Sequence, residues 1–151
     1  MNTKTLFLLL ALAFLFIMGI YVLVHPSYQK SLQAKYFFEM GNYKEALVLA
    51  KEAFSMDVYN RMASTIMAQT ITALKYASYI EMGEKYMAAI NIIATHENIS
   101  DADTAKIRTM CEIMVAEYIK LAPSVITDEN LVQEASEYHH KFEKLLEKVT
   151  R

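Results

Sequence analysis

The residues that could do chemistry are few, and they do not form a complete site. Glu137 and His140 have the E-x-x-H spacing that helices of di-iron bundles use. Such a site needs a second E-x-x-H pair and two further inward-facing carboxylates, and the sequence holds no second copy of the motif. Glu137 also lies on the charged side of its expected helix, away from Ala135. We therefore predict that this pair is a solvated surface feature that binds no metal.

The single cysteine and the other histidines give no nucleophile either. Cys111 lies on an apolar helical stretch beside Met110 and Met114, a setting typical of a core thiol rather than a reactive one. His96 follows an expected helix, where an imidazole complements the helix dipole. No phosphate-binding glycine loop, H-E-x-x-H or G-x-S-x-G motif occurs. The sequence thus favours a protein that is not an enzyme and uses no cofactor.

The longest apolar segment is Leu6 to Val24, which carries no charge. As a helix it would be roughly 28 Å long, about the thickness of the hydrocarbon core of a bilayer. The run is longer than the apolar region of a secretory signal, and no small-x-small cleavage pattern follows it. We expect residues 1–25 to form a short tail and a single transmembrane helix that is retained. A cleaved signal peptide is the alternative.

The basic residues near this segment bear on its orientation. Lys4 lies in the short tail, and the positive-inside rule therefore favours a cytoplasmic N-terminus, although Lys30 and Lys35 nearly balance it. The usage of Lys, Ile, Tyr, Phe and Asn is typical of an AT-rich bacterial genome. We expect a bacterial inner (cytoplasmic) membrane protein with its domain on the periplasmic side. The net charge of −2 and the lack of a basic patch argue against nucleic-acid binding.

Residues 26–151 are expected to be all-α, because 3 Gly and 2 Pro in the whole chain leave few turns. Helix start and stop signals divide this region into six helices, or three helical hairpins. Gly83 is the ambiguous signal. A turn there would divide residues 59–94 into two helices, but apolar residues continue through it at a seven-residue spacing, which leaves one continuous helix open. The main signals are Ser27, Gly41, Asn42, Gly83, Ser100, Pro123 and Thr127.

Residues 40–60, MGNYKEALVLAKEAFSMDVYN, resemble the turn and second helix of a tetratricopeptide repeat. The resemblance covers residues 27–60 and departs from the family pattern at Lys30, Gln33 and Val58. It implies a degenerate second repeat over residues 61–99 and a capping hairpin over residues 100–151. A generic helical bundle is the alternative. The repeat-defining residues would be Ala34, Gly41, Tyr43, Ala46, Ala53 and Phe54, with Gly83 and Ala88 in the second copy.

In tetratricopeptide arrays the first helix of each hairpin lines a concave surface, so the resemblance implies a partner-binding groove. Its surface would be apolar with few charges, which suits a helix or an extended apolar peptide. The alternative is that Tyr28 and Phe38 pack against the anchor or neighbouring helices. The groove residues would be Tyr28, Ser31, Lys35, Phe38, Glu39, Thr70, Ala73, Ala77, Ile80 and Glu81.

These features predict a membrane-anchored protein–protein interaction module. It would act as a scaffold, assembly factor or chaperone for a bacterial envelope complex, such as a motor, secretion or division assembly. Its partners would be another protein, itself associated with the membrane, and the lipid bilayer through Leu6 to Val24. The alternative is a constitutive small structural subunit that forms a homodimer through Met- and Tyr-rich helical faces.

Overall fold

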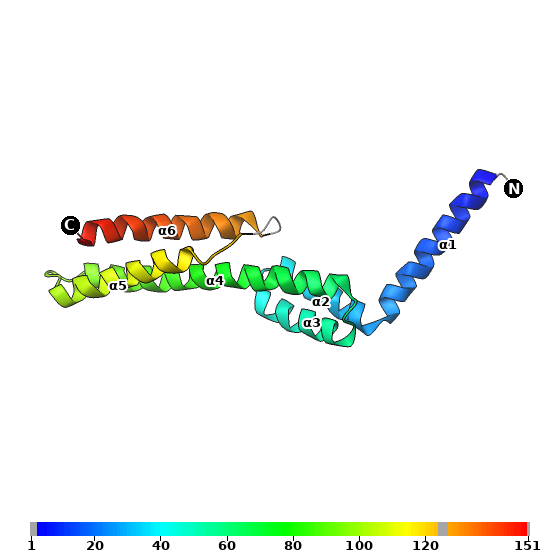
Figure 1. The fold of residues 1–151 in the computed structure, drawn as a ribbon, viewed down its shortest axis with the longest axis horizontal. Helices are drawn as coiled ribbons and strands as arrows, with labels where there is room; N and C mark the ends of the chain where they lie inside the picture. The colour runs from blue at the N-terminus through cyan, green and yellow to red at the C-terminus, as the bar shows by residue number, and fades with distance from the viewer. Residues whose placement is uncertain (1–2, 124–126, 151) are drawn as a thin grey trace. The chain divides into compact units, whose positions relative to one another are not determined.

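The computed structural model describes residues 3–123 and 127–150 and is all-α over those residues, as the sequence predicts (Figure 1). The chain divides into two compact units, residues 1–71 and 72–151, which are described in turn. Helix α4 contributes residues to both units. The described helices are α1 (Thr3–Val24), α2 (Pro26–Glu39), α3 (Tyr43–Met56), α4 (Arg61–Ala94), α5 (Asp101–Tyr118) and α6 (Glu129–Thr150).

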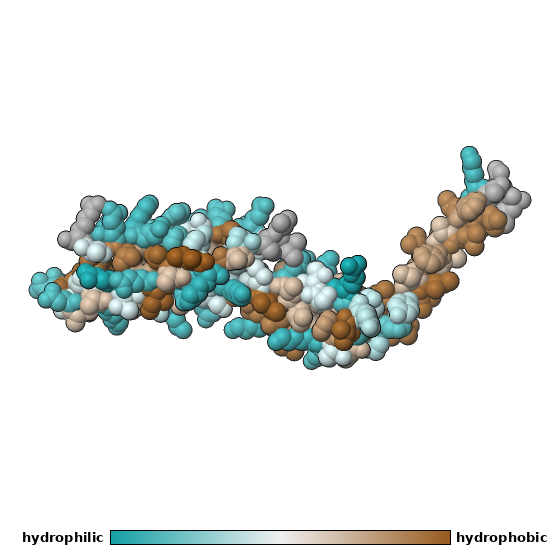
Figure 2. Space-filling view, in the orientation of Figure 1, coloured by the Kyte–Doolittle hydropathy of each residue, from teal (hydrophilic) through white to brown (hydrophobic). Residues whose placement is uncertain are grey.

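Helix α1 is apolar on every side and leaves almost all of its side chains exposed. Figure 2 shows the resulting hydrophobic surface along the helix. Lys4–Val24 is the one helix in the described part of the chain that is long and apolar enough to cross a membrane. A helix can do so because it satisfies its own backbone N–H and C=O groups without water. The prediction of a candidate N-terminal membrane span is therefore confirmed.

Helices α2 and α3 lie side by side as a tight hairpin (Figure 1). Gly41 makes the turn with a positive φ of 75°, a conformation that favours glycine, and the Asn42 N–H donates to the Phe37 carbonyl. The Asn42 side chain then accepts from the Glu45 N–H and caps α3. The sequence-based turn at Gly41 and Asn42 is thus correct. Ser27 was expected to cap α2 but does not, because its buried hydroxyl donates to the Ala53 carbonyl instead.

The two helices approach each other through small side chains. Ala34 on α2 and Ala46, Ala50 and Ala53 on α3 are fully buried. Larger apolar residues from α2, α3 and the first part of α4 close the core of this unit around them. They are Leu49 and Ile66, which are buried, and Phe37, Phe38, Met62 and Met67, which are half-buried.

The core of the second unit joins the later part of α4 to the α5–α6 hairpin. Ser100 caps α5 by accepting from the Asp103 N–H, as predicted, whereas α6 begins after Asp128 rather than at Thr127. Cys111 is fully buried, and burial raises the pKa of its thiol, which fits the predicted core role. The buried members of this core are Tyr76, Tyr79, Ile80, Ile90, Ile93, Ile107, Met110, Cys111, Met114, Ala135 and Phe142.

Helix α4 runs without interruption through Gly83, so the expected turn at this glycine is wrong. A Cβ atom at position 83 would lie 2.8 Å from Cδ1 of the Tyr138 ring and 3.2 Å from Cε of Met114. The glycine therefore admits an aromatic ring from α6 and does not end a helix. Five helices, not six, follow α1 in the described chain, and residues 61–94 form no hairpin. Ala88 is exposed and is not a buried counterpart of Ala46.

Candidate functional site

The structure does not assemble the expected groove in the first unit. Ser31 is fully buried, and its hydroxyl donates to the Ser27 carbonyl and accepts from the Asn60 amide. Thr70 is also buried and donates to the Ile66 carbonyl. Tyr28 and Phe38 are half-buried, and the Phe38 ring packs edge-on against Tyr43. Two predicted groove residues on α2 are exposed: Lys35 and Glu39.

Most of the predicted groove residues of the second unit are also buried or half-buried. Ala73 and Ile80 are buried, Ala77 is half-buried and Glu81 is exposed. The reason is that the seven-residue apolar spacing marks the buried stripe of one continuous helix. The groove prediction is therefore wrong for Ser31, Thr70, Ala73 and Ile80, which are core residues.

Helix α2 instead exposes a stripe of large apolar side chains that the groove prediction missed. Leu32, Tyr36 and Met40 are spaced four residues apart, and their exposed fractions are 43%, 61% and 66%. The fully buried or almost fully buried residues of α2 are small, namely Ser27, Ser31 and Ala34, and Phe37 and Phe38 near its end are half-buried against the same core. Leu32, Tyr36 and Met40 thus lie on the side of α2 away from the small residues, although large apolar residues usually face the core. The alternation of a small-residue face and a large apolar face was the available sequence signal.

The borders of this stripe are polar. Residues 29 and 33 are exposed glutamines, and Lys35 and Glu39 are exposed at its edge. An apolar patch with a polar rim on a helix of a small unit is typical of a surface that another protein covers. We refer to Leu32, Tyr36 and Met40 as the α2 stripe.

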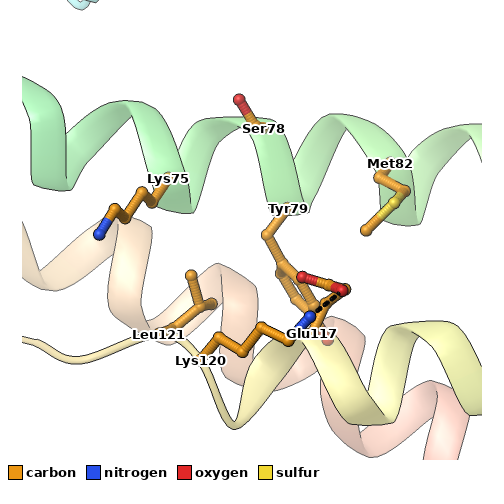
Figure 3. Close-up of a pocket in the computed structure, with 7 residues that line it drawn as sticks. All are labelled: Lys75, Ser78, Tyr79, Met82, Glu117, Lys120 and Leu121. Carbon is orange, nitrogen blue, oxygen red and sulfur yellow. Dashed lines mark hydrogen bonds and ion pairs between the residues drawn. The ribbon is translucent and has the colours of Figure 1, made fainter.

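The second unit contains a shallow cavity of about 450 Å³ between α4 and the end of α5 (Figure 3). Tyr79 and Met82 extend from α4 towards Leu121 and the ion pair that Lys120 makes with Glu117. Lys75 lines the same cavity. The lining therefore combines an apolar floor with charged groups at its rim, and it brings no nucleophile next to a base.

Two buried polar atoms of the second unit have no hydrogen-bond partner among the described residues. They are the hydroxyl of Tyr79 and Nδ1 of His139. Burial is the main cause that raises the pKa of Tyr79 to about 12, and the nearby Tyr118 and the charge of Glu143 are the smaller causes. The His139 ring stacks on Tyr118 with a centroid distance of 4.0 Å, and its Nε2 lies 3.3 Å from Glu143. This cluster belongs to the core, and Tyr79 stays protonated at neutral pH.

The E-x-x-H pair adjoins this cluster, because Glu143 contacts both His139 and His140. Glu137 is exposed, as predicted, and accepts from Gln133, whereas His140 contacts Glu143 at 3.2 Å. Within residues 3–123 and 127–150, no three His, Cys, Asp or Glu side chains gather closely enough to hold a metal ion.

Comparisons of the chain with family models, curated proteins and solved structures find no match. The burial of Ala34, Ala46 and Ala53 fits the tetratricopeptide pattern, but close contact through alanines is a property of any tight helical hairpin. Membership of that family therefore remains a prediction from residues 27–60.

Proposed function

We propose that this protein is a membrane-anchored module that binds another protein through the α2 stripe. The observation that carries the proposal is the exposure of Leu32, Tyr36 and Met40, which lie outside the hairpin while small residues of α2 are buried in it. Apolar side chains at a four-residue spacing are the anchors by which a helix docks into a groove or against another helix. Tyrosine is also among the residues that contribute most to interface affinity.

The position of α2 favours a partner at the membrane. Pro26 begins this helix directly after α1 ends at Val24, so the stripe lies close along the chain to the proposed membrane span. A partner that is itself held in or near the membrane meets such a surface at a raised effective concentration. We propose a scaffold, assembly factor or chaperone of a bacterial envelope complex, anchored in the inner membrane with its helical units on the periplasmic side.

The experiment is partner recovery from detergent-solubilised membranes with the full chain and a Leu32→Gln/Tyr36→Gln/Met40→Gln variant. Glutamine is a good helix former, and exposed substitutions usually change the free energy of unfolding by less than about 0.5 kcal/mol. We expect the helical signal and melting temperature to be preserved and the partner to be lost. The matched control is Val48→Gln on α3, which is also exposed and apolar.

Full recovery of the partner by the triple variant would contradict the proposal. A homodimer through the same stripe is the second candidate, favoured by the Tyr36 and Met40 side chains that lie in it. Light scattering of the purified full chain distinguishes the two. A dimer that the triple substitution converts to a monomer would assign the stripe to self-association.

A further inference from the structure

The turn between α3 and α4 exposes apolar side chains where turns are normally polar. Val58 is 64% exposed and Tyr59 is 91% exposed, and Met56 beside them is exposed as well. Each of the three side chains is more than half exposed.

The exposure is built into the turn and is not the result of a frayed end. The Asp57 carboxylate accepts from the Tyr59 N–H at 2.9 Å, and the Asp57 carbonyl accepts from the Asn60 N–H at 3.1 Å. Asn60 is itself fully buried and caps α4 by accepting from the Ala63 N–H. Hydrogen bonds of the flanking residues Asp57 and Asn60 therefore fix the backbone that carries Val58 and Tyr59.

The same contacts place the turn beside the end of α1. The Asn60 amide donates to the Ser27 hydroxyl at 2.7 Å, and that hydroxyl donates to the Ala53 carbonyl at 2.9 Å. Ser27 follows the last residue of α1, Val24, by three positions. Met56 and Asp57 also line one cavity with Tyr21 of α1. Thus the turn lies next to the point where the apolar helix stops.

We propose that this turn, residues 56–59, rests in the headgroup region of the bilayer as a second membrane contact. The proposal depends on the anchoring of α1 that the proposed function includes. Tyrosine is enriched at membrane interfaces, because its ring enters the apolar boundary while its hydroxyl stays hydrated. Two further tyrosines lie at the junction of α1 and α2: Tyr21 and Tyr28, whose rings are 6.2 Å apart. Arg61 follows the turn, is exposed and carries the charge that lipid phosphates attract.

The experiment uses tryptophan as a depth probe, because the chain contains none. Tyr59→Trp, Tyr21→Trp and Lys44→Trp are made in the full chain and reconstituted in vesicles of phosphatidylcholine with some phosphatidylglycerol. The phosphatidylcholine is either unmodified or brominated near the headgroup end of its acyl chains. Lys44→Trp is the control, since position 44 is exposed, lies outside the α2 stripe and is about 18 Å along α3 from Met56. An alkaline carbonate wash of the same vesicles tests anchoring.

We expect a blue-shifted emission and strong quenching by brominated lipid for Tyr59→Trp and Tyr21→Trp, and neither for Lys44→Trp. If only Tyr21→Trp is quenched, the membrane contact of the turn is refuted while the anchor stands. If the Tyr59→Trp emission is blue-shifted but bromine does not quench it, a second copy of the chain covers the turn, which also refutes the proposal. If the wash releases the protein and no variant is quenched, the anchor fails together with the contact.

Discussion

The side-chain amide of Asn60 donates a 2.7 Å hydrogen bond to the hydroxyl of Ser27, which lies 33 residues earlier in the chain. The same amide donates to the Ser31 hydroxyl at 2.9 Å, and all three side chains are buried. This network joins the beginning of α2 to the beginning of α4. Because each donor and acceptor in it is used, it fixes how the first unit is assembled.

Asn60→Ala should destabilise the first unit by about 2–4 kcal/mol. The substitution removes the cap of α4 and leaves two buried serine hydroxyls without a donor. Denaturant melts of the full chain in detergent, followed by circular dichroism, measure the loss. Asn42→Ala is the control, because that cap is exposed and its hydrogen bond is longer, at 3.4 Å. Equal effects of the two substitutions would show that the buried network contributes nothing beyond capping.

Gly83→Ala should destabilise the second unit by about 1–3 kcal/mol, although alanine is the better helix former. The new Cβ would lie within 3.0 Å of two ring atoms of Tyr138. The Tyr138→Leu substitution should recover part of the loss by removing the ring. Thermal melts of the single and double variants form the test, and a Gly83→Ala variant more stable than the wild type would contradict the close packing.

Tyr79 should make the stability of the second unit fall between about pH 10 and 12. Its pKa is near 10 when unfolded and about 12 when folded, so the folded chain binds more protons in this window and loses stability as the pH rises through it. Tyrosinate absorbance and denaturant melts at successive pH values follow the loss. The Tyr79→Phe variant should flatten the dependence and, by removing an unpaired buried hydroxyl, should not be less stable at neutral pH.

The proposed orientation can be tested with introduced cysteines, because the native thiol of Cys111 is buried. A membrane-impermeant maleimide should label Lys44→Cys in intact spheroplasts, and Asn2→Cys, which keeps Lys4, only after the membrane is opened. Lys44 is exposed. The opposite labelling pattern would place the helical units in the cytoplasm.

Helix ends were predictable where a local signal decides them. Gly41 needs its positive φ, and Ser100 pairs with Asp103 within one turn, so neighbouring residues suffice. Gly83 has no such local cause. Its role depends on the Tyr138 ring, which a different helix supplies, and the sequence cannot distinguish a glycine that ends a helix from one that admits a ring.

The candidate site was less predictable than the fold for a related reason. A hairpin over residues 61–94 would place Ala73 and Ile80 on an open surface, whereas one continuous helix turns them into the core. On α2, the resemblance to a repeat implies a groove position for Ser31, although small residues favour close packing of helices. The exposed stripe was visible in the spacing of Leu32, Tyr36 and Met40, but only the position of α3 shows which face of α2 is covered.

The most direct test of partner binding is photocrosslinking in intact membranes, with benzoylphenylalanine in place of Tyr36. Its control carries the same group in place of Lys44, which is exposed on α3 outside the stripe. We predict one discrete adduct with a second protein at position 36 and none at position 44. No adduct at position 36, or the same products at both positions, would contradict the account.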